Sequence, residues 1–387
     1  MGDWANLLPD ILHIILKKLI SSKDFLASVT FGAVCTSWRS VYVQVKDVIK
    51  QLPPQVIWLM LAEERDHNDK RGFFSLAKGN TRYLQLPEAK RKFCFSFPEG
   101  WLITAGEDFD LNLLHPLSRV QFQLPNLRTI PEPEIYLKYT SFPVVIRRAL
   151  LTANPSFTSD FKVIIILHCD SIAFAKLGDN AWTMTKERDS FADVTCYKGN
   201  IYGLDWMGNI WVCDIEGSEP KATKLFCMKD ERFVSHIERA YLVESSGELL
   251  AVFRIGVDTR PLFEGSTICT YGTTQVLVFK LNISNRSSTR LESLENRALF
   301  VGHNSSISVD ALNICGCKPN SIYFTDDAEE SYLAESGEDE FHTNLTECGG
   351  GRDMGVCNLM DGKIEPLFTP PSYCCVAPPL WVFPNFP

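Results

Sequence analysis

The sequence has no apolar run long enough to span a membrane. Its densest run after the first fifty residues is Val163–Leu167, whereas a membrane-spanning helix needs about 20 residues. Basic residues are also few, with 38 Lys and Arg against 47 Asp and Glu. Non-specific nucleic-acid binding needs clustered basic residues, so we expect neither a nucleic-acid nor a membrane partner. The N-terminus has no small-residue cleavage site of a secretory signal, which favours the cytoplasm or nucleus.

The motifs of several common enzyme classes are missing too. The chain contains no G-x-x-x-x-G-K-[ST], no H-E-x-x-H and no G-x-S-x-G, which argues against a P-loop enzyme, a zincin and an α/β-hydrolase. The thirteen cysteines include Cys315-Gly316-Cys317 but no Cys-x-x-Cys pair. We therefore expect reduced, buried thiols in strands and no metal site.

One acidic pair needs separate treatment. Asp326 and Asp327 follow an apolar strand, but neighbouring side chains on a strand point to opposite faces. We therefore expect a turn at the strand end and no acid–base pair. The sequence predicts no catalytic residue, no cofactor and no enzyme activity.

The first fifty residues carry a helical pattern. Apolar residues recur at helical spacing along one stripe, namely Leu8, Ile11, Leu12, Ile15, Leu16 and Leu19. Pro9 suits the first helical position, because its missing N–H has no partner there anyway. Residues 21–24 interrupt the pattern, a short helix is predicted over 24–31, and a third over 33–45. Residues 1–50 thus form a predicted three-helix module, and 51–69 a linker.

From residue 70 to 387 the pattern changes to short strands and turns. Turns recur roughly every 8–12 residues, which is typical of a β-sandwich, barrel or propeller. The clearest hairpin pairs 201–205 with 210–214. A degenerate repeat of about 40–50 residues favours a propeller of six or seven blades. Acidic residues near 328–351 predict a solvated loop, and "PPLWVFP" at 378–384 is expected to close the ring.

Two parts of the chain resemble known families. The order Trp4, Leu8-Pro9, apolar stripe, Asp24 and Val34-Cys35-Thr36-Ser37-Trp38-Arg39 resembles a plant F-box. Five further stretches resemble the KIB-type β-propeller domain found in plant F-box proteins: 241–254, 291–309, 317–327, 353–367 and 378–384. The resemblance implies a mainly β protein in which a small three-helix F-box precedes a β-propeller.

The resemblance also implies a function. An F-box packs its apolar face on a Skp-type adaptor and so joins a cullin–RING ubiquitin ligase, while the propeller binds a protein target. The residues implied in adaptor binding are Leu8, Pro9, Ile11, Leu12, Ile15, Leu19, Val34, Cys35, Trp38 and Arg39. Packing of these residues against the propeller is the structural alternative.

Two other functions stay open at this point. The first is an F-box scaffold or decoy that acts outside ubiquitination. The second is a propeller enzyme such as a glycoside hydrolase, which the lack of a suitable carboxylate set disfavours.

Overall fold

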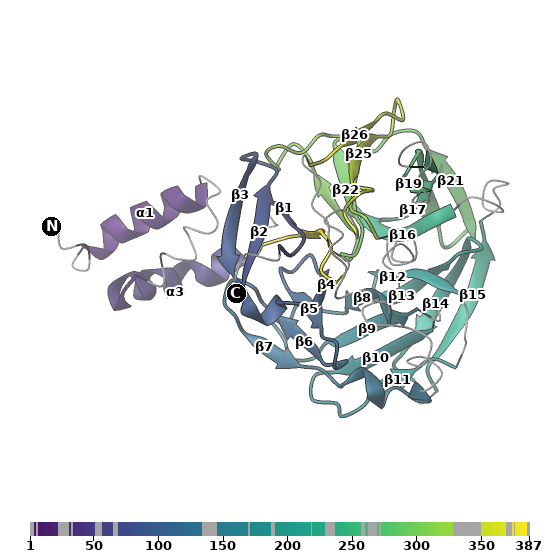
Figure 1. Ribbon diagram of the computed structural model, residues 1–387, viewed down its shortest axis with the longest axis horizontal. Helices are drawn as coiled ribbons and strands as arrows, with labels where there is room; N and C mark the ends of the chain where they lie inside the picture. Colours follow the sequence, from purple (N-terminus) through teal and green to yellow (C-terminus); the bar gives the residue numbers. More distant parts are fainter. Residues whose placement is uncertain are drawn as a thin grey trace.

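The computed structural model describes residues 4, 7–21, 31, 34–50, 56–64, 69–133, 145–168, 171–186, 190–217, 219–228, 237–256, 260–261, 269–270, 272–327, 350–368, 374 and 376–384. Its strands form sheets that stand around a common centre (Figure 1). The first three sheets, each given in strand order, are β27 (Leu380–Val382), β1 (Trp58–Met60), β2 (Lys70–Ser75) and β3 (Asn80–Gln85); β4 (Phe93–Ser96), β5 (Leu102–Ala105), β6 (Leu111–Leu114) and β7 (Gln121–Gln123); and β8 (Ile146–Leu151), β9 (Lys162–Leu167), β10 (Ile172–Lys176) and β11 (Thr183–Met184).

The next three sheets complete the ring. They are β12 (Phe191–Tyr197), β13 (Asn200–Asp205), β14 (Asn209–Asp214) and β15 (Lys221–Cys227); β16 (Ile237–Ser245), β17 (Glu248–Ile255), β20 (Gln275–Asn282) and β21 (Ser287–Leu291); and β23 (Ile307–Asp310), β22 (Arg297–Val301), β24 (Ser321–Phe324), β25 (Gly355–Asn358) and β26 (Ile364–Pro366). Shorter elements are β18 (Arg260–Pro261), β19 (Cys269–Thr270), η2 (Pro87–Ala89) and η3 (Leu127–Thr129). The described residues thus form a six-bladed β-propeller, at the lower of the two predicted blade numbers.

The predicted hairpins are confirmed. β13 pairs antiparallel with β14, with Ile201 opposite Cys213. The turn between β16 and β17 places Ser246 and Gly247 at φ values of 51° and 80°. Glycine readily adopts a left-handed conformation, which suits Gly247 to this turn.

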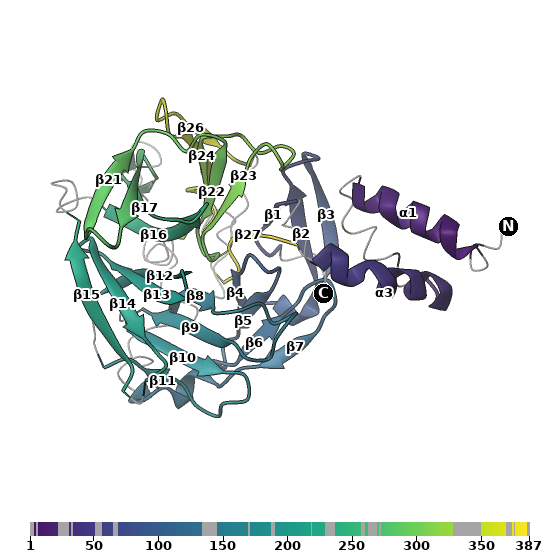
Figure 2. The same cartoon turned by 180° about the vertical axis from the view of Figure 1, so that it is seen from behind.

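Two helices precede the propeller, α1 (Pro9–Ser21) and α3 (Thr36–Lys50). Figures 1 and 2 show both outside the ring, on the side of β2 and β3. The helix predicted over 24–31 lies outside the described residues except for Phe31, which is helical. No helix within the described part of the chain is both long and apolar enough to cross a membrane.

The ring closes through strands from opposite ends of the propeller. β27 pairs antiparallel with β1, and Trp58 lies opposite Val382. The predicted role of the C-terminal stretch in closing the ring is confirmed. The prediction of a linker over 51–69 is wrong at β1. This strand lies within the predicted linker and belongs to the first blade. A strand of three residues is too short to reveal an alternating pattern.

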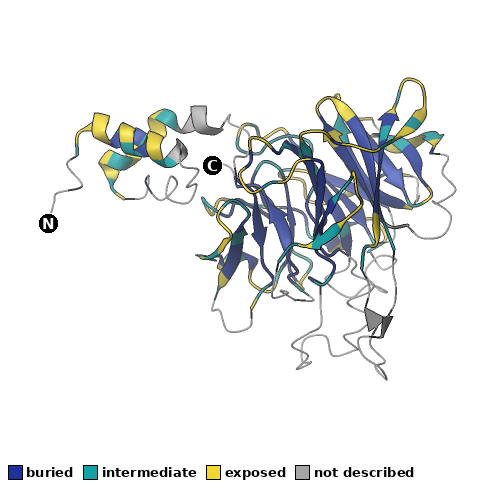
Figure 3. Cartoon of the chain, turned by 90° about the horizontal axis from the view of Figure 1, so that it is seen from above, coloured by how far each residue is buried: buried dark blue, intermediate teal, exposed yellow. Residues whose placement is uncertain are grey.

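Trp381 anchors the closing strand. It is fully buried and contacts the rings of Phe300 at 4.9 Å and Tyr323 at 5.9 Å, both in the sixth blade. The hydroxyl of Ser96 in the second blade donates a hydrogen bond to the carbonyl of Trp381. Figure 3 shows the strands of the blades mostly buried. Trp381 in the first blade therefore contacts both neighbouring blades, the sixth and the second.

The connection between β22 and β23 contacts two other blades. The N–H of Ser305 donates to the carbonyl of Ser96 at 2.8 Å, and its hydroxyl donates to the carbonyl of Ala149 at 2.9 Å. The ring of His303 meets that of Phe93 edge-on at 4.8 Å. Residues from the sixth blade thus reach the innermost strands of the second and third blades.

Removal of the Trp381 side chain tests ring closure. We expect Trp381→Ala to lower the free energy of unfolding by about 3–5 kcal/mol, because it leaves a large cavity between blades. Urea denaturation measures this change. Phe157→Ala is the matched control, since Phe157 is 57% exposed and should tolerate truncation. Equal stability of the two variants would contradict the closing role.

Candidate functional site

The two helices have a small core of their own. Leu12, Leu16, Phe31 and Val41 are almost fully buried. The ring of Phe31 lies 4.5 Å from that of Trp38, whose indole N–H donates to the carbonyl of Trp4 at 2.9 Å. The helical pair therefore packs through its own side chains.

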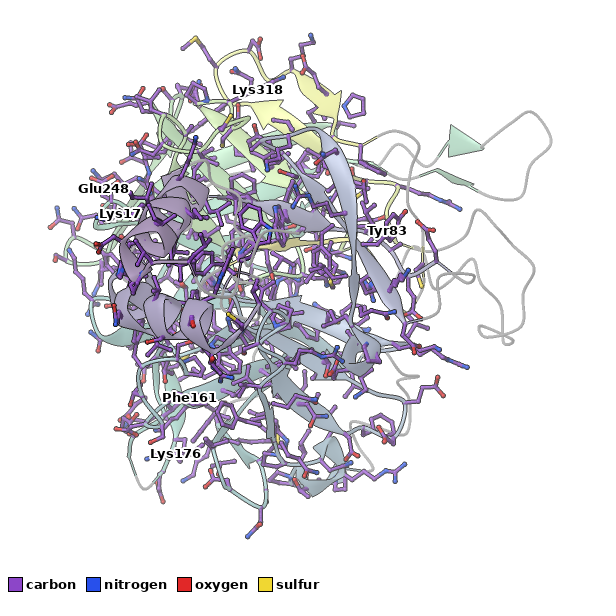
Figure 4. The ribbon with its side chains drawn as sticks, turned by 90° about the vertical axis from the view of Figure 1, so that its left-hand side faces the viewer. Lys17, Tyr83, Phe161, Lys176, Glu248 and Lys318 are labelled. Atoms are coloured by element: carbon purple, nitrogen blue, oxygen red, sulfur yellow. The ribbon has the colours of Figure 1, made fainter. Side chains whose placement is uncertain are left out.

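A second apolar sector of the helices faces solvent. Leu8 just before α1 is 69% exposed, Ile14 on α1 is 61% exposed, and Val34 before α3 is 55% exposed. Figure 3 shows exposed and buried positions side by side on both helices. In Figure 4 the helices lie in front of the ring, with Lys17 labelled on α1. Several exposed apolar side chains on one small module indicate a surface for another protein.

The ten predicted binding residues divide into three groups. The structure places five on the surface, Leu8, Pro9, Ile11, Val34 and Arg39. Four more are half-buried, namely Ile15, Leu19, Cys35 and Trp38. Leu12 is fully buried, because the centre of the predicted stripe faces the core of the helical pair. Ile14, which lies off the predicted stripe, is exposed as well.

The propeller carries a second group of polar residues, buried at the end of β24. Asp327 is fully buried and accepts hydrogen bonds from Arg148 at 2.6 Å and from Arg254 at 2.7 Å. The hydroxyl of Tyr241 lies 3.0 Å from the same carboxylate, and Arg239 donates to the Asp327 carbonyl at 2.7 Å. Burial alone would raise the pKa of Asp327, but the three guanidinium groups hold it well below its usual range.

The neighbouring Asp326 has different partners. One of its carboxylate oxygens accepts the backbone N–H groups of Gly351 at 2.8 Å, Arg352 at 3.0 Å and Asp353 at 3.3 Å. The carboxylates of Asp326 and Asp327 thus have different direct partners, and Arg254 links the two groups because it also donates to the carboxylate of Asp353. Both residues follow β24 as predicted, but the structure describes them as fully buried and outside any turn. The predicted acidic loop near 328–351 lies outside the described residues apart from 350 and 351.

The sequence of this chain is similar to those of known proteins. The family described as KIB1-4 beta-propeller matches residues 73–358. The chain belongs to this family. The putative F-box protein At5g55150 of Arabidopsis thaliana is 24% identical to it over 395 residues, covering 99% of this chain and 98% of that protein. The F-box protein SKIP23 of the same plant is 26% identical over 422 residues, covering 99% and 96%. The predicted resemblance to plant F-box proteins with a KIB-type propeller is confirmed.

The KIB1-4 propeller shows no gathered metal ligands within the described ranges, where no three His, Cys, Asp or Glu side chains come together. Its cysteines lie in mixed environments. Cys357 is buried in β25, whereas Cys315 is exposed in the segment after β23. The prediction of buried thiols in strands is therefore wrong for Cys315, which lies between β23 and β24, outside any strand, and is exposed.

Two buried groups near the centre of the KIB1-4 propeller titrate abnormally. Burial raises the pKa of Asp193 to about 6, although Arg148 and two backbone N–H groups favour its ionised form. Burial lowers the pKa of His303 to about 3, so this ring is neutral in the folded protein near pH 7. Their unfolded values are about 3.9 and 6.5. Between about pH 4 and 6, Asp193 is protonated in the folded state and ionised in the unfolded chain. In the same range His303 is neutral in the folded state and protonated in the unfolded chain.

The carboxylate of Asp327 should be essential to the fold. We expect Asp327→Ala to lower the free energy of unfolding by about 3–5 kcal/mol, because buried guanidinium groups would lose their counter-charge. Glu365→Gln is the control. Glu365 pairs with Lys318 at 2.6 Å on the surface, where solvent screens the pair. The melting temperature of the Glu365→Gln variant should therefore stay close to that of wild type. A similar small effect of both variants would show that the buried network is dispensable.

The two abnormal groups should act on stability with opposite sign. Lowering pH from 6 to 4 raises the free energy of unfolding through Asp193 and lowers it through His303. Relative to wild type, Asp193→Asn should therefore lose about 1.4 kcal/mol per pH unit on acidification, and His303→Gln should gain a similar amount. Urea titrations across this pH range measure both slopes. Parallel pH profiles for the three proteins would rule out the two shifted pKa values.

Proposed function

We propose that this chain is the substrate-recognition subunit of an SCF-type cullin–RING ubiquitin ligase. The exposed apolar sector of the helical pair carries this proposal, because the pair already has its own core and needs no further cover to pack. The helical pair acts as an F-box, for which the sequence predicts a further short helix over 24–31, and binds a Skp-type adaptor. The names of the relatives At5g55150 and SKIP23 support this assignment.

The size of the sector fits a stable contact. Full burial of one Leu, Ile or Val side chain contributes about 1.5–3 kcal/mol, while association itself costs roughly 4–15 kcal/mol. Leu8, Ile11 and Val34 alone would only balance that cost. The half-buried Ile15 and Trp38 extend the same contact, since each still presents part of its side chain to solvent.

The propeller supplies the second half of the function. It binds a target protein, and the ligase complex then brings that target close to the subunits that transfer ubiquitin. In this division of labour the chain contributes binding and proximity and is not itself an enzyme. No disulfide joins the nine cysteines with described side chains, which supports a reducing compartment, the cytoplasm or nucleus. The alternative is an F-box scaffold or decoy whose bound proteins are not ubiquitinated.

Adaptor binding tests the proposal. We expect Leu8→Ala combined with Pro9→Ala to reduce co-purification of a Skp-type adaptor and cullin by at least about tenfold, because two exposed contacts are lost. Circular dichroism should remain that of wild type, since neither residue belongs to the helical core. Co-purification at matched expression, measured by quantitative mass spectrometry, gives the result.

Two controls sharpen this test. Met360→Ala changes a propeller residue that is 76% exposed and should leave adaptor binding intact. Wild-type levels of adaptor in the double variant would overturn the F-box assignment. Turnover of a bound protein separates the ligase from the scaffold, because only the ligase should shorten the half-life of that protein in an adaptor-dependent way.

A further inference from the structure

The innermost strands of several blades end close together at one end of the ring axis. β4, β12 and β16 each turn there into the second strand of their own blade (Figure 1). The hydroxyl of Tyr197, at the end of β12, donates to the carbonyl of Gly247 in the turn after β16 at 2.9 Å. The hydroxyl of Ser245, at the end of β16, lies 2.7 Å from that of Ser308 in the sixth blade. We call this the turn end of the axis.

Solvent reaches the axis at the turn end. On β12, residues 191–195 are buried, whereas Cys196 is half-buried. The connection from the sixth blade changes in the same way, with 301–304 buried and 305–308 half-buried. The polar network around Asp327 lies instead near the starts of β8 and β16 and is buried. A partner can therefore approach the axis from the turn end.

Glu99 brings a carboxylate without a counter-charge to this end. It lies in the turn between β4 and β5 and is half-buried. Its Oε2 is buried and accepts no hydrogen bond, and within the described part of the chain no Lys, Arg or His forms an ion pair with it. Burial raises the pKa of Glu99, although its own backbone N–H favours the ionised form. A carboxylate removed from water without a cation beside it costs free energy, which a cationic partner would offset.

The charge of Glu99 acts across the axis. Burial and the carboxylate of Glu99 together raise the pKa of the Cys196 thiol to about 11. Glu99 belongs to the second blade and Cys196 to the fourth, and since the third blade separates them, their side chains come close only near the axis. Ser306 follows Ser305, which bonds to the second and third blades, and its own hydroxyl oxygen is buried without a hydrogen-bond partner. We call Glu99, Cys196 and Ser306 the axial site.

We propose that the axial site binds a lysine side chain of the target protein. A lysine ammonium is a compact cation on a flexible four-carbon stem, so it can reach the axis while its backbone stays outside the ring. An ammonium can pair with Glu99 through one oxygen, whereas the planar guanidinium of arginine favours two, and Oε2 is buried. The hydroxyl of Ser306 is a further acceptor after a change of rotamer, which is common at interfaces. This inference rests on the proposed role as a substrate receptor, since it names the side chain that such a receptor would recognise.

A displayed library of random dodecapeptides, selected on the full-length chain, tests the proposal. We expect the enriched peptides to share a lysine, and their Kd, measured by fluorescence polarisation, to rise at least about tenfold when that lysine is Nε-acetylated. Glu99→Gln should raise the Kd of the unmodified peptides to a similar extent. Glu107→Gln is the matched control, because Glu107 is an exposed carboxylate of the same blade that pairs with Arg91 at 3.2 Å. It should leave the Kd unchanged.

Two further readouts separate binding from a structural role of Glu99. Glu99→Gln removes a buried charge that has no counter-charge, so its melting temperature should not fall below that of wild type while its Kd rises. Bound peptide should slow the alkylation of Cys196 by iodoacetamide several-fold, as read by mass spectrometry. Cys227 is exposed on β15, the outermost strand of the same blade, so its alkylation rate should not change.

The outcomes separate this inference from the proposed function. Glu99→Gln should still co-purify the adaptor at wild-type levels, so loss of peptide with retention of adaptor supports the axial site. A library that yields no binder, peptides without a shared lysine, equal Kd for the acetylated peptide, or equal loss in Glu107→Gln would each overturn it. So would a lower melting temperature of Glu99→Gln or an unchanged alkylation rate of Cys196. Failure of the wild-type chain to bind any adaptor would instead overturn the receptor role, whatever the peptides do.

Discussion

The pairing of β27 with β1 is the contact on which the rest of the ring depends. Each blade is a small twisted sheet that buries both faces only when it has a neighbour on either side. Without β27, the first blade would lose its innermost strand, and Trp381 would no longer fill the space against Phe300 and Tyr323. The hydrogen bond from Ser96 shows that closure also reaches the second blade.

A second constraint lies in the polar interior. Asp327 from the sixth blade meets arginines from the third and fifth blades. Buried ion pairs contribute little net stability compared with apolar packing, because both partners lose water. They do penalise wrong arrangements strongly, since any shift leaves a charge uncompensated. We interpret the network as fixing the blades relative to one another, while apolar contacts provide most of the stability.

Local patterns were readable in the sequence, and long-range partners were not. The hairpin at 201–214 and the closing strand at 378–384 could be predicted, because glycine turns and bounded apolar runs are local signals. The strand at Trp58–Met60 was missed, since its partners are far away in sequence. The burial of Asp326 and Asp327 depends on residues more than twenty positions away, such as Gly351 and Arg148.

The helical face shows the same limit. The apolar stripe correctly predicted a helix, but it could not separate the side turned to Phe31 and Val41 from the side turned to solvent. Leu12, which belongs to the predicted binding set, is therefore buried, whereas Ile14, which does not, is exposed. The contact between Trp206 and Arg147 could not be predicted, because these residues become neighbours only when two blades pack together.

Ring closure by β27 also has a consequence for the order of synthesis. A ribosome makes the helical pair first and the closing strand after every other described strand. A transcript that stops before residue 378 would therefore encode intact helices joined to an open ring. If the helices bind an adaptor, such a product would occupy it without presenting a target, and would act as a dominant inhibitor of the full-length protein.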